Sequence, residues 1–203
     1  MASIVCVLKT GGDFKIEHVQ ALASELPGLI CLSDTLIPDV VTIPLRHNWP
    51  GWWSKMELFR PGIKGDLFYL DLDTLVFGDI RPIIEAANGR TTMLSDFYWP
   101  EKPASGLMYI AEEDKPRVWA EWLKNPALHM RQRPGRGVIG DQGFLGKVLK
   151  PQRWQAIAPG KIVSYKAHCK GGKRPKGAQI VCFHGKPRPW ELTPQQLEAL
   201  KCS

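Results

Sequence analysis

The stretch Asp66-Leu67-Phe68-Tyr69-Leu70-Asp71-Leu72-Asp73-Thr74-Leu75-Val76-Phe77 places two acidic residues inside a run that is otherwise apolar. Residues 67–70 are apolar at both alternating positions, which is typical of a central strand covered on both faces. Burying unpaired carboxylates beside such a strand is costly, so we expect something to compensate their charge. In an extended chain the i, i+2 spacing would place Asp71 and Asp73 on the same side.

The two aspartates follow the end of the predicted strand, where ligands collect in open α/β sheets. Two carboxylates and the oxygens of a diphosphate would form an oxygen-rich site suited to Mg²⁺ or Mn²⁺. Asp-x-Asp is also a common turn-forming pattern at strand ends. The motif by itself therefore leaves a metal site and a simple turn both open.

Strand and helix patterns alternate on either side of this stretch. Residues 3–8 and 29–32 read as buried strands, and the apolar positions between them keep the three-to-four spacing of one helix face, with Asp13 as the expected cap. Further strands are expected at residues 40–43, 75–77, 107–110 and 179–183, and helices at 81–87, 115–123, from 141 and from 194. This order predicts a single α/β domain over residues 1–203, with a mostly parallel central sheet flanked by helices.

Composition limits the class of protein. The chain has 203 residues, 44% hydrophobic and 23% charged, which supports a packed core and argues against disorder. No apolar run reaches the roughly 18 residues of a membrane span. Residues 4–8 read as a first strand and not a signal peptide, so a cytoplasmic location is the default expectation. The five cysteines show no framework and are expected to be reduced.

Charge is distributed unevenly along the chain. Residues 1–128 carry 12 Lys/Arg and 17 Asp/Glu, whereas residues 129–203 carry 15 and 3. The cations gather in Gly- and Pro-rich loops at 131–140 and 168–177. The asymmetry suggests an anionic partner, which could be a nucleotide diphosphate, an anionic acceptor, a membrane face or nucleic acid. A merely solvated basic face is the alternative.

Tyr69-Leu-Asp-Leu-Asp-Thr-Leu-Val76 is very close to a metal-binding motif of glycosyltransferases, and the whole chain resembles the nucleotide-sugar glycosyltransferases of the GT-A fold, which is Rossmann-like. The resemblance is to family 8, the glycogenin-like and galactosyltransferase-like group. Other segments resemble that family in the same order: Val7–Thr10 with Phe14, Trp53–Leu58, Ser105–Met108, Gly140–Gln142 and Phe183–Trp190.

The resemblance implies a UDP-sugar donor, Mn²⁺ (or Mg²⁺) and retention of anomeric configuration. It implies that Asp71, Asp73 and His184 hold the metal, and that Asp141 and Gln142 lie near the anomeric carbon. It implies that the donor is contacted by Thr10, Phe14, Lys55, Asp71, Ser105, Gly106, Gly185, Lys186 and Arg188.

The closing motif departs from the family pattern. The family histidine precedes the glycine by three positions, which here is Cys182, whereas His184 directly precedes Gly185. Arg188 stands where the family has a lysine. Either His184 or Cys182 is thus the candidate for the third ligand position.

Other interpretations remain open at this point. Asp141 could simply cap a helix. His168, Cys169, Cys182 and His184 could be imagined as a zinc site, but they lack Cys-x-x-Cys spacing. A sugar-1-phosphate nucleotidyltransferase would need a richer glycine signature after the first strand, and a nucleic-acid-binding module would need aromatics among its cations. The favoured interpretation is a metal-dependent glycosyltransferase that acts on an unidentified hydroxyl acceptor, with an anionic acceptor as one alternative.

Overall fold

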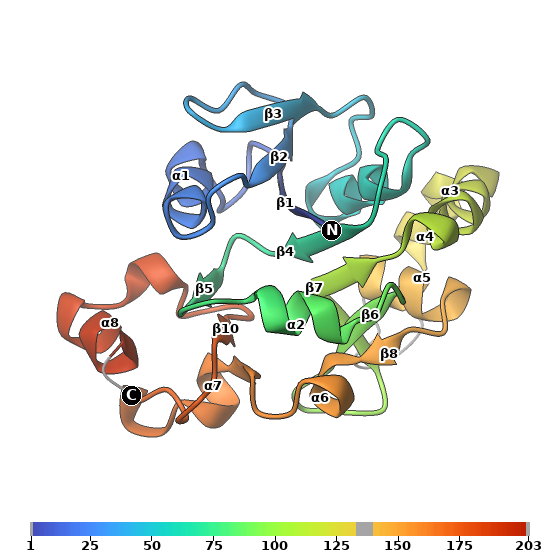
Figure 1. The fold of residues 1–203 in the computed structure, drawn as a ribbon. Coiled ribbons are helices and arrows are strands. Elements are labelled where there is room, and N and C mark those ends of the chain that lie inside the picture. Colours follow the sequence, from blue (N-terminus) through green and yellow to red (C-terminus); the bar gives the residue numbers. More distant parts are fainter. Residues whose placement is uncertain (1, 133–139, 202–203) are drawn as a thin grey trace.

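The computed structural model describes residues 2–132 and 140–201. Its main feature is a seven-stranded sheet with the order β3-β2-β1-β4-β7-β6-β8 (Figure 1). The strands are β1 (Ser3–Leu8), β2 (Ile30–Ser33), β3 (Val41–Pro44), β4 (Leu67–Leu70), β6 (Thr92–Ser95), β7 (Pro103–Ile110) and β8 (Gln152–Arg153). Among these described strands β7 alone runs against the others, because it pairs antiparallel with both β4 and β6. The predicted α/β class with a mostly parallel sheet is confirmed.

Alternate residues of the central strands enter two different apolar layers. In β1, Cys6 and Leu8 join one buried cluster, whereas Val5 and Val7 join the other. Strand β4 does the same, and all four of its residues are buried. This two-sided burial is the reason that residues 67–70 are apolar throughout instead of alternating with polar residues.

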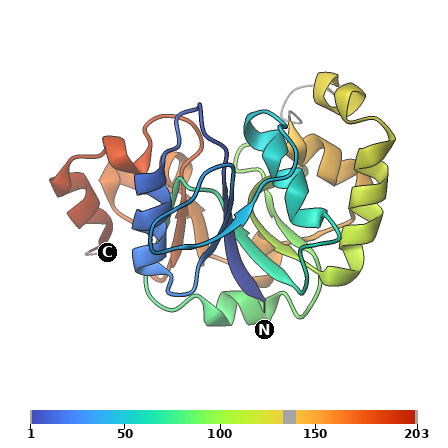
Figure 2. The ribbon, with the colours of Figure 1, turned by 90° about the horizontal axis from the view of Figure 1, so that it is seen from above.

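Helices cover both faces of the sheet (Figure 2). Helix α1 (Ile16–Glu25) lies on one side and buries Val19 and Leu22. The 3₁₀ segment η1 (Gly51–Phe59), α3 (Lys115–Lys124) and α5 (Asp141–Val148) lie on the other side. There they enclose Trp53 and Trp122, whose rings stack at 5.3 Å.

A second, three-stranded sheet has the order β5-β10-β9, with β5 (Thr74–Val76), β10 (Ile180–Cys182) and β9 (Ile162–Ser164). The stretch from residue 66 to 77 is therefore not one continuous strand of one sheet. The chain leaves the central sheet after β4 and pairs β5 antiparallel with β10. Asp71 and Asp73 lie at this change of sheet.

Shorter elements complete the described chain. These are α2 (Arg81–Ala86), η2 (Glu112–Asp114), α4 (Pro126–Arg131), α6 (Trp154–Ile157), α7 (Tyr165–His168), η3 (Lys170–Gly172), η4 (Pro189–Glu191) and α8 (Pro194–Lys201). No helix within residues 2–132 and 140–201 is long and apolar enough to cross a membrane. Four cysteines, at positions 6, 31, 169 and 182, are free and buried, as expected of reduced thiols.

The expected elements are present, and the differences from them have local causes. Asp13 does not cap the first helix, because α1 begins at Ile16 with Lys15 at the N-cap. Asp13 instead faces Arg188, with 3.5 Å between Oδ2 and Nη2. The sequence patterns also missed η1, β6 and β9. The two strands have only four and three residues, too few for a clear period, and η1 is a 3₁₀ segment, which does not follow the 3.6-residue period of an α-helix. Most of the loop expected at 131–140, namely residues 133–139, and Cys202 lie outside the described residues.

Close packing between α5 and β7 leads to a stability prediction. A Cβ added at Gly146 would lie 2.5 Å from Pro103 Cγ, so Gly146→Ala should destabilise the fold by about 1–3 kcal/mol. Gly12→Ala is the control, since its Cβ would meet nothing within 4 Å. Urea unfolding of both variants measures the difference. A more stable Gly146→Ala protein would show that helix propensity outweighs the clash.

Candidate functional site

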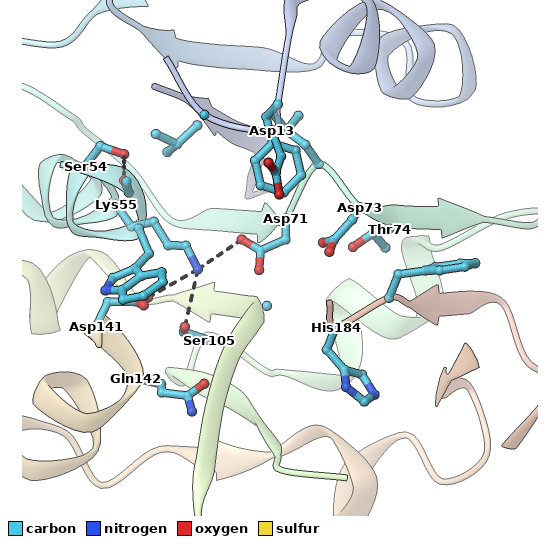
Figure 3. Close-up of a pocket in the computed structure, with 18 of the residues that line it drawn as sticks. Asp13, Ser54, Lys55, Asp71, Asp73, Thr74, Ser105, Asp141, Gln142 and His184 are labelled. Carbon is cyan, nitrogen blue, oxygen red and sulfur yellow. Dashed lines mark hydrogen bonds and ion pairs between the residues drawn. The ribbon is translucent and has the colours of Figure 1, made fainter. Parts of the chain in front are cut away.

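Several segments meet at the carboxyl edge of the parallel strands. Asp71 follows β4, and its backbone N–H donates to the Gly106 carbonyl of β7 at 2.9 Å. Because β7 is antiparallel to β4, the first residues of β7 lie at the same edge as the end of β4. Helix α5 also begins there with the buried Asp141, and Lys55 reaches in from η1 (Figure 3). A strand edge of this kind is the usual ligand-binding position in an open α/β sheet.

Lys55 links Asp71 to the start of α5. Its buried Nζ lies 3.0 Å from Asp71 Oδ1, 3.3 Å from Asp141 Oδ2 and 3.4 Å from Ser105 Oγ (Figure 3). Burial by itself would lower the pKa of Lys55, but the Asp141 and Asp71 carboxylates outweigh it and raise the pKa. The Tyr69 hydroxyl also donates to Asp71 Oδ1. Asp71 is therefore fixed in position by a permanent cation and a phenol.

Asp73 has a different environment. It is buried, and its Oδ2 accepts a hydrogen bond from the Arg188 guanidinium. Burial and the nearby Asp71 charge raise the pKa of Asp73 to about 7, although Arg188 acts in the opposite direction. Two carboxylates that repel one another in this way form a site that would gain stability from a further cation.

Asp71 and Asp73 line a cavity of about 920 Å³. Most of the predicted site residues share its lining: Thr10, Phe14, Lys55, Ser105, Gly106, Asp141, Gln142, His184, Gly185 and Arg188. They come from the loop after β1, from η1, from the start of β7 and α5, and from the loop after β10. The structure thus brings together residues up to 178 positions apart in the chain, from Thr10 to Arg188.

Lys186 lies elsewhere. It belongs to a neighbouring hollow, its side chain is 80% exposed, and its Nζ pairs with Glu191 Oε1 at 3.1 Å. In this arrangement its ammonium group does not reach the large cavity, so the donor contact predicted for it requires a movement of its loop.

His184 lines the cavity but does not join the two carboxylates. Its Nε2 lies 2.6 Å from Ser164 Oγ, its ring stacks at 5.7 Å on Phe97, and Figure 3 shows the imidazole directed away from Asp71 and Asp73. Metal ligation by His184 stays a prediction, and it requires the ring to leave Ser164 and turn. Burial and the nearby Asp73 and Asp71 charges raise the pKa of Cys182, so metal ligation at that position would require the thiol to give up its proton.

The proposed zinc alternative has little geometric support. His168 Nδ1 accepts the Ser164 backbone N–H at 2.9 Å, which orients its ring toward its own helix. Within the part of the chain that the structure describes, no three His, Cys, Asp or Glu side chains converge in a metal-holding group. A cation at this site would thus take Asp71 and Asp73 as its protein ligands. Two carboxylates are hard oxygen donors, which fit Mg²⁺ or Mn²⁺ if a diphosphate supplies further oxygens.

Several cavity residues were not found from the sequence. Trp52 and Tyr98 line the cavity while remaining 54% and 56% exposed, and Asp96 and Phe97 lie beside Tyr98. The polar Ser95-Asp96 pair after the apolar Met93-Leu94 could have indicated the end of a further strand, and hence a residue at the site. No pattern in the neighbouring sequence indicated that Trp52 would line the cavity.

The comparisons with solved structures identify the fold. The glycosyltransferase GlyE of Streptococcus pneumoniae TIGR4 matches with a TM-score of 0.62 and 12% identity, over 94% of this chain and 56% of that one. The galactosyltransferase LgtC, solved in complex with donor and acceptor sugar analogs, matches with a TM-score of 0.60 and 12% identity, over 97% of this chain and 92% of that one. A glycosyltransferase involved in glycosylation of the major capsid of PBCV-1 matches with a TM-score of 0.52 and 13% identity, over 93% and 96%.

This chain spans little more than half of the length of GlyE. No protein-family model matches the chain, and no curated protein matches it either. At such low identity the structural similarity establishes the fold and not the activity. The chain therefore has the GT-A fold expected from its sequence, which it shares with these glycosyltransferases.

Proposed function

We propose that this chain is a metal-dependent glycosyltransferase that moves a hexose from a UDP-sugar to an acceptor hydroxyl with retention of configuration. The observation that carries the proposal is the position of Asp71 and Asp73. They lie together at the carboxyl edge of a GT-A sheet, inside a cavity of about 920 Å³. A structural turn would not need two buried or half-buried carboxylates that face a cavity and require counter-charges.

The donor would lie across this edge. Asp71 and Asp73 would hold Mn²⁺ or Mg²⁺, which when bound would stabilise the negative charge that develops on the leaving diphosphate. Thr10 and Phe14 in the loop after β1 would contact the nucleoside. The Thr10 N–H and Oγ1 donate to Asp34 at 3.0 and 2.9 Å, and these bonds hold the loop after β1 in place.

The sugar would face Lys55 and the first residues of α5. Lys55 stays protonated because its pKa is raised, and it would both orient Asp71 and present a fixed positive charge. Asp141 and Gln142 would orient the sugar near its anomeric carbon, and Ser105, Gly106 and Gly185 would complete the wall. The acceptor hydroxyl would attack from the side on which the diphosphate leaves.

The acceptor would enter at the rim formed by Trp52 and Tyr98. Both rings are more than half exposed and also line the cavity. Exposed aromatic rings that line a cavity are typical of ligand recognition.

A panel of sugar nucleotides tests the proposal. UDP-glucose, UDP-galactose, UDP-N-acetylglucosamine and GDP-mannose are each incubated with the chain in Mn²⁺, Mg²⁺ or EDTA, and released nucleoside diphosphate is measured. We expect slow hydrolysis of at least one UDP-sugar with metal and none in EDTA. Thermal-shift measurements on the same panel detect donor binding separately from cleavage. Failure of every sugar nucleotide to bind or react would disprove the proposal.

A further inference from the structure

The Arg188 guanidinium contacts two residues of the proposed donor site, namely the metal-binding Asp73 and the nucleoside-contacting Phe14. Its guanidinium donates to Asp73 Oδ2, and its Nη2 lies 3.5 Å from Asp13 Oδ2. The guanidinium carbon also lies 5.0 Å from the centre of the Phe14 ring, in a cation–π arrangement. One side chain thus bridges the acidic pair to the aromatic ring proposed to contact the nucleoside.

The protein does not fully satisfy Arg188 in this position. Its Nε is buried and has no hydrogen-bond partner within the described residues. A buried donor of this kind is costly, and the contact with Asp13 is long and made to a side chain that is 71% exposed. Arg188 is therefore held mainly by Asp73, which needs a counter-charge.

Arg188 provides the positive charge that compensates the buried Asp73 carboxylate. Asp71 already has Lys55 at 3.0 Å, whereas Asp73 has Arg188 as its ion-pair partner among the described residues. Removing one partner of a buried pair leaves the other charge uncompensated. A divalent ion that binds the carboxylates can take over this role with two charges instead of one.

We propose that Arg188 is a displaceable internal cation, which neutralises Asp73 and covers Phe14 in the donor-free chain and must leave both before metal and nucleoside bind. The proposal rests on the proposed function for the identity of the nucleoside site. The exchange between Arg188 and a divalent cation does not depend on which sugar nucleotide is used.

The first test measures Mn²⁺ alone, by the electron paramagnetic resonance signal of free Mn²⁺, with no nucleotide present. Arg188→Met should bind Mn²⁺ roughly tenfold more tightly than the unaltered chain, because the competing cation is gone. Asp13→Asn should shift the affinity in the same direction by less, since it removes only the long contact. Arg81→Met is the matched control: Arg81 pairs with exposed Asp79 at 2.7 Å and does not line the cavity, so its loss removes the same charge outside the site.

Thermal unfolding separates this effect from a folding defect. In EDTA, Arg188→Met should melt below the unaltered chain, and Mn²⁺ should then raise its melting temperature by more than it raises that of the unaltered chain. Unchanged or weaker Mn²⁺ binding by Arg188→Met would overturn the proposal, because the ion would then bind beside Arg188 without displacing it. A gain of the same size in Arg81→Met would overturn it too, since the effect would be one of net charge.

Uridine tests the second contact of Arg188, since it carries no phosphate to attract the guanidinium. Uncovering Phe14 should tighten uridine binding in Arg188→Met, measured by calorimetry in EDTA. Unchanged or undetectable uridine binding by that variant would overturn the claim that Arg188 covers the nucleoside site, while the Mn²⁺ result would still decide its exchange with the metal.

Discussion

Asp73→Asn is expected to abolish metal-dependent cleavage of the donor, lowering its rate by about 100-fold to 1,000-fold or more. Asparagine keeps the shape of the side chain but removes the charge of one of the two carboxylates proposed to hold the metal. Asp71→Asn should lower the cleavage rate by a similar factor, because it removes the other charged metal ligand together with the Lys55 ion pair. Both losses should appear in release of nucleoside diphosphate and, independently, as weaker Mn²⁺ binding.

Asp79→Asn is the matched control for these substitutions. Asp79 carries the same charge in a nearby segment, but it is exposed and pairs with Arg81 outside the cavity. Its donor cleavage and Mn²⁺ affinity should stay within about twofold of the unaltered chain, as for other surface changes. Full activity of Asp73→Asn in Mn²⁺ would refute the assignment of the metal site to this pair.

Glu57→Ala is expected to lower the free energy of unfolding by about 3–5 kcal/mol. Glu57 is fully buried in η1, and its carboxylate accepts the Arg46 and His47 backbone N–H groups at 2.7 and 2.8 Å. It also pairs with the buried Arg60, whose Nε lies 3.3 Å from Oε2. Removing it leaves the buried Arg60 guanidinium without its counter-charge and two backbone N–H groups without their acceptor, which is the costly way to break such a network.

Urea unfolding measures this loss, and Glu121→Ala provides the control. Glu121 makes an exposed pair with Lys124 at i, i+3, so its loss should change stability by less than about 1 kcal/mol. Equal effects at the two positions would show that burial of Glu57 is not what makes its network important. Because η1 carries Lys55, we also expect Glu57→Ala to weaken donor binding.

The sequence by itself determined the class of fold and the edge at which the site lies. The apolar run at residues 67–70 is typical of a strand covered on both faces, and this predicted the acids that follow it at the carboxyl end of that strand. The spacing of apolar residues is a local property of the sequence, so β1, β4 and α3 could be predicted directly from it. The resemblance in motif order then predicted which loops would meet, and all but Lys186 of the predicted residues line one cavity.

Only the tertiary structure decided which groups face one another. No local pattern shows that Lys55 lies between Asp71 and Asp141, that His184 bonds to Ser164, or that Arg188 pairs with Asp73. These contacts join residues 16 to 115 positions apart, and each depends on how whole elements pack. Side-chain charge and spacing fix what a residue can bind, but burial and the competition between partners fix what it does bind.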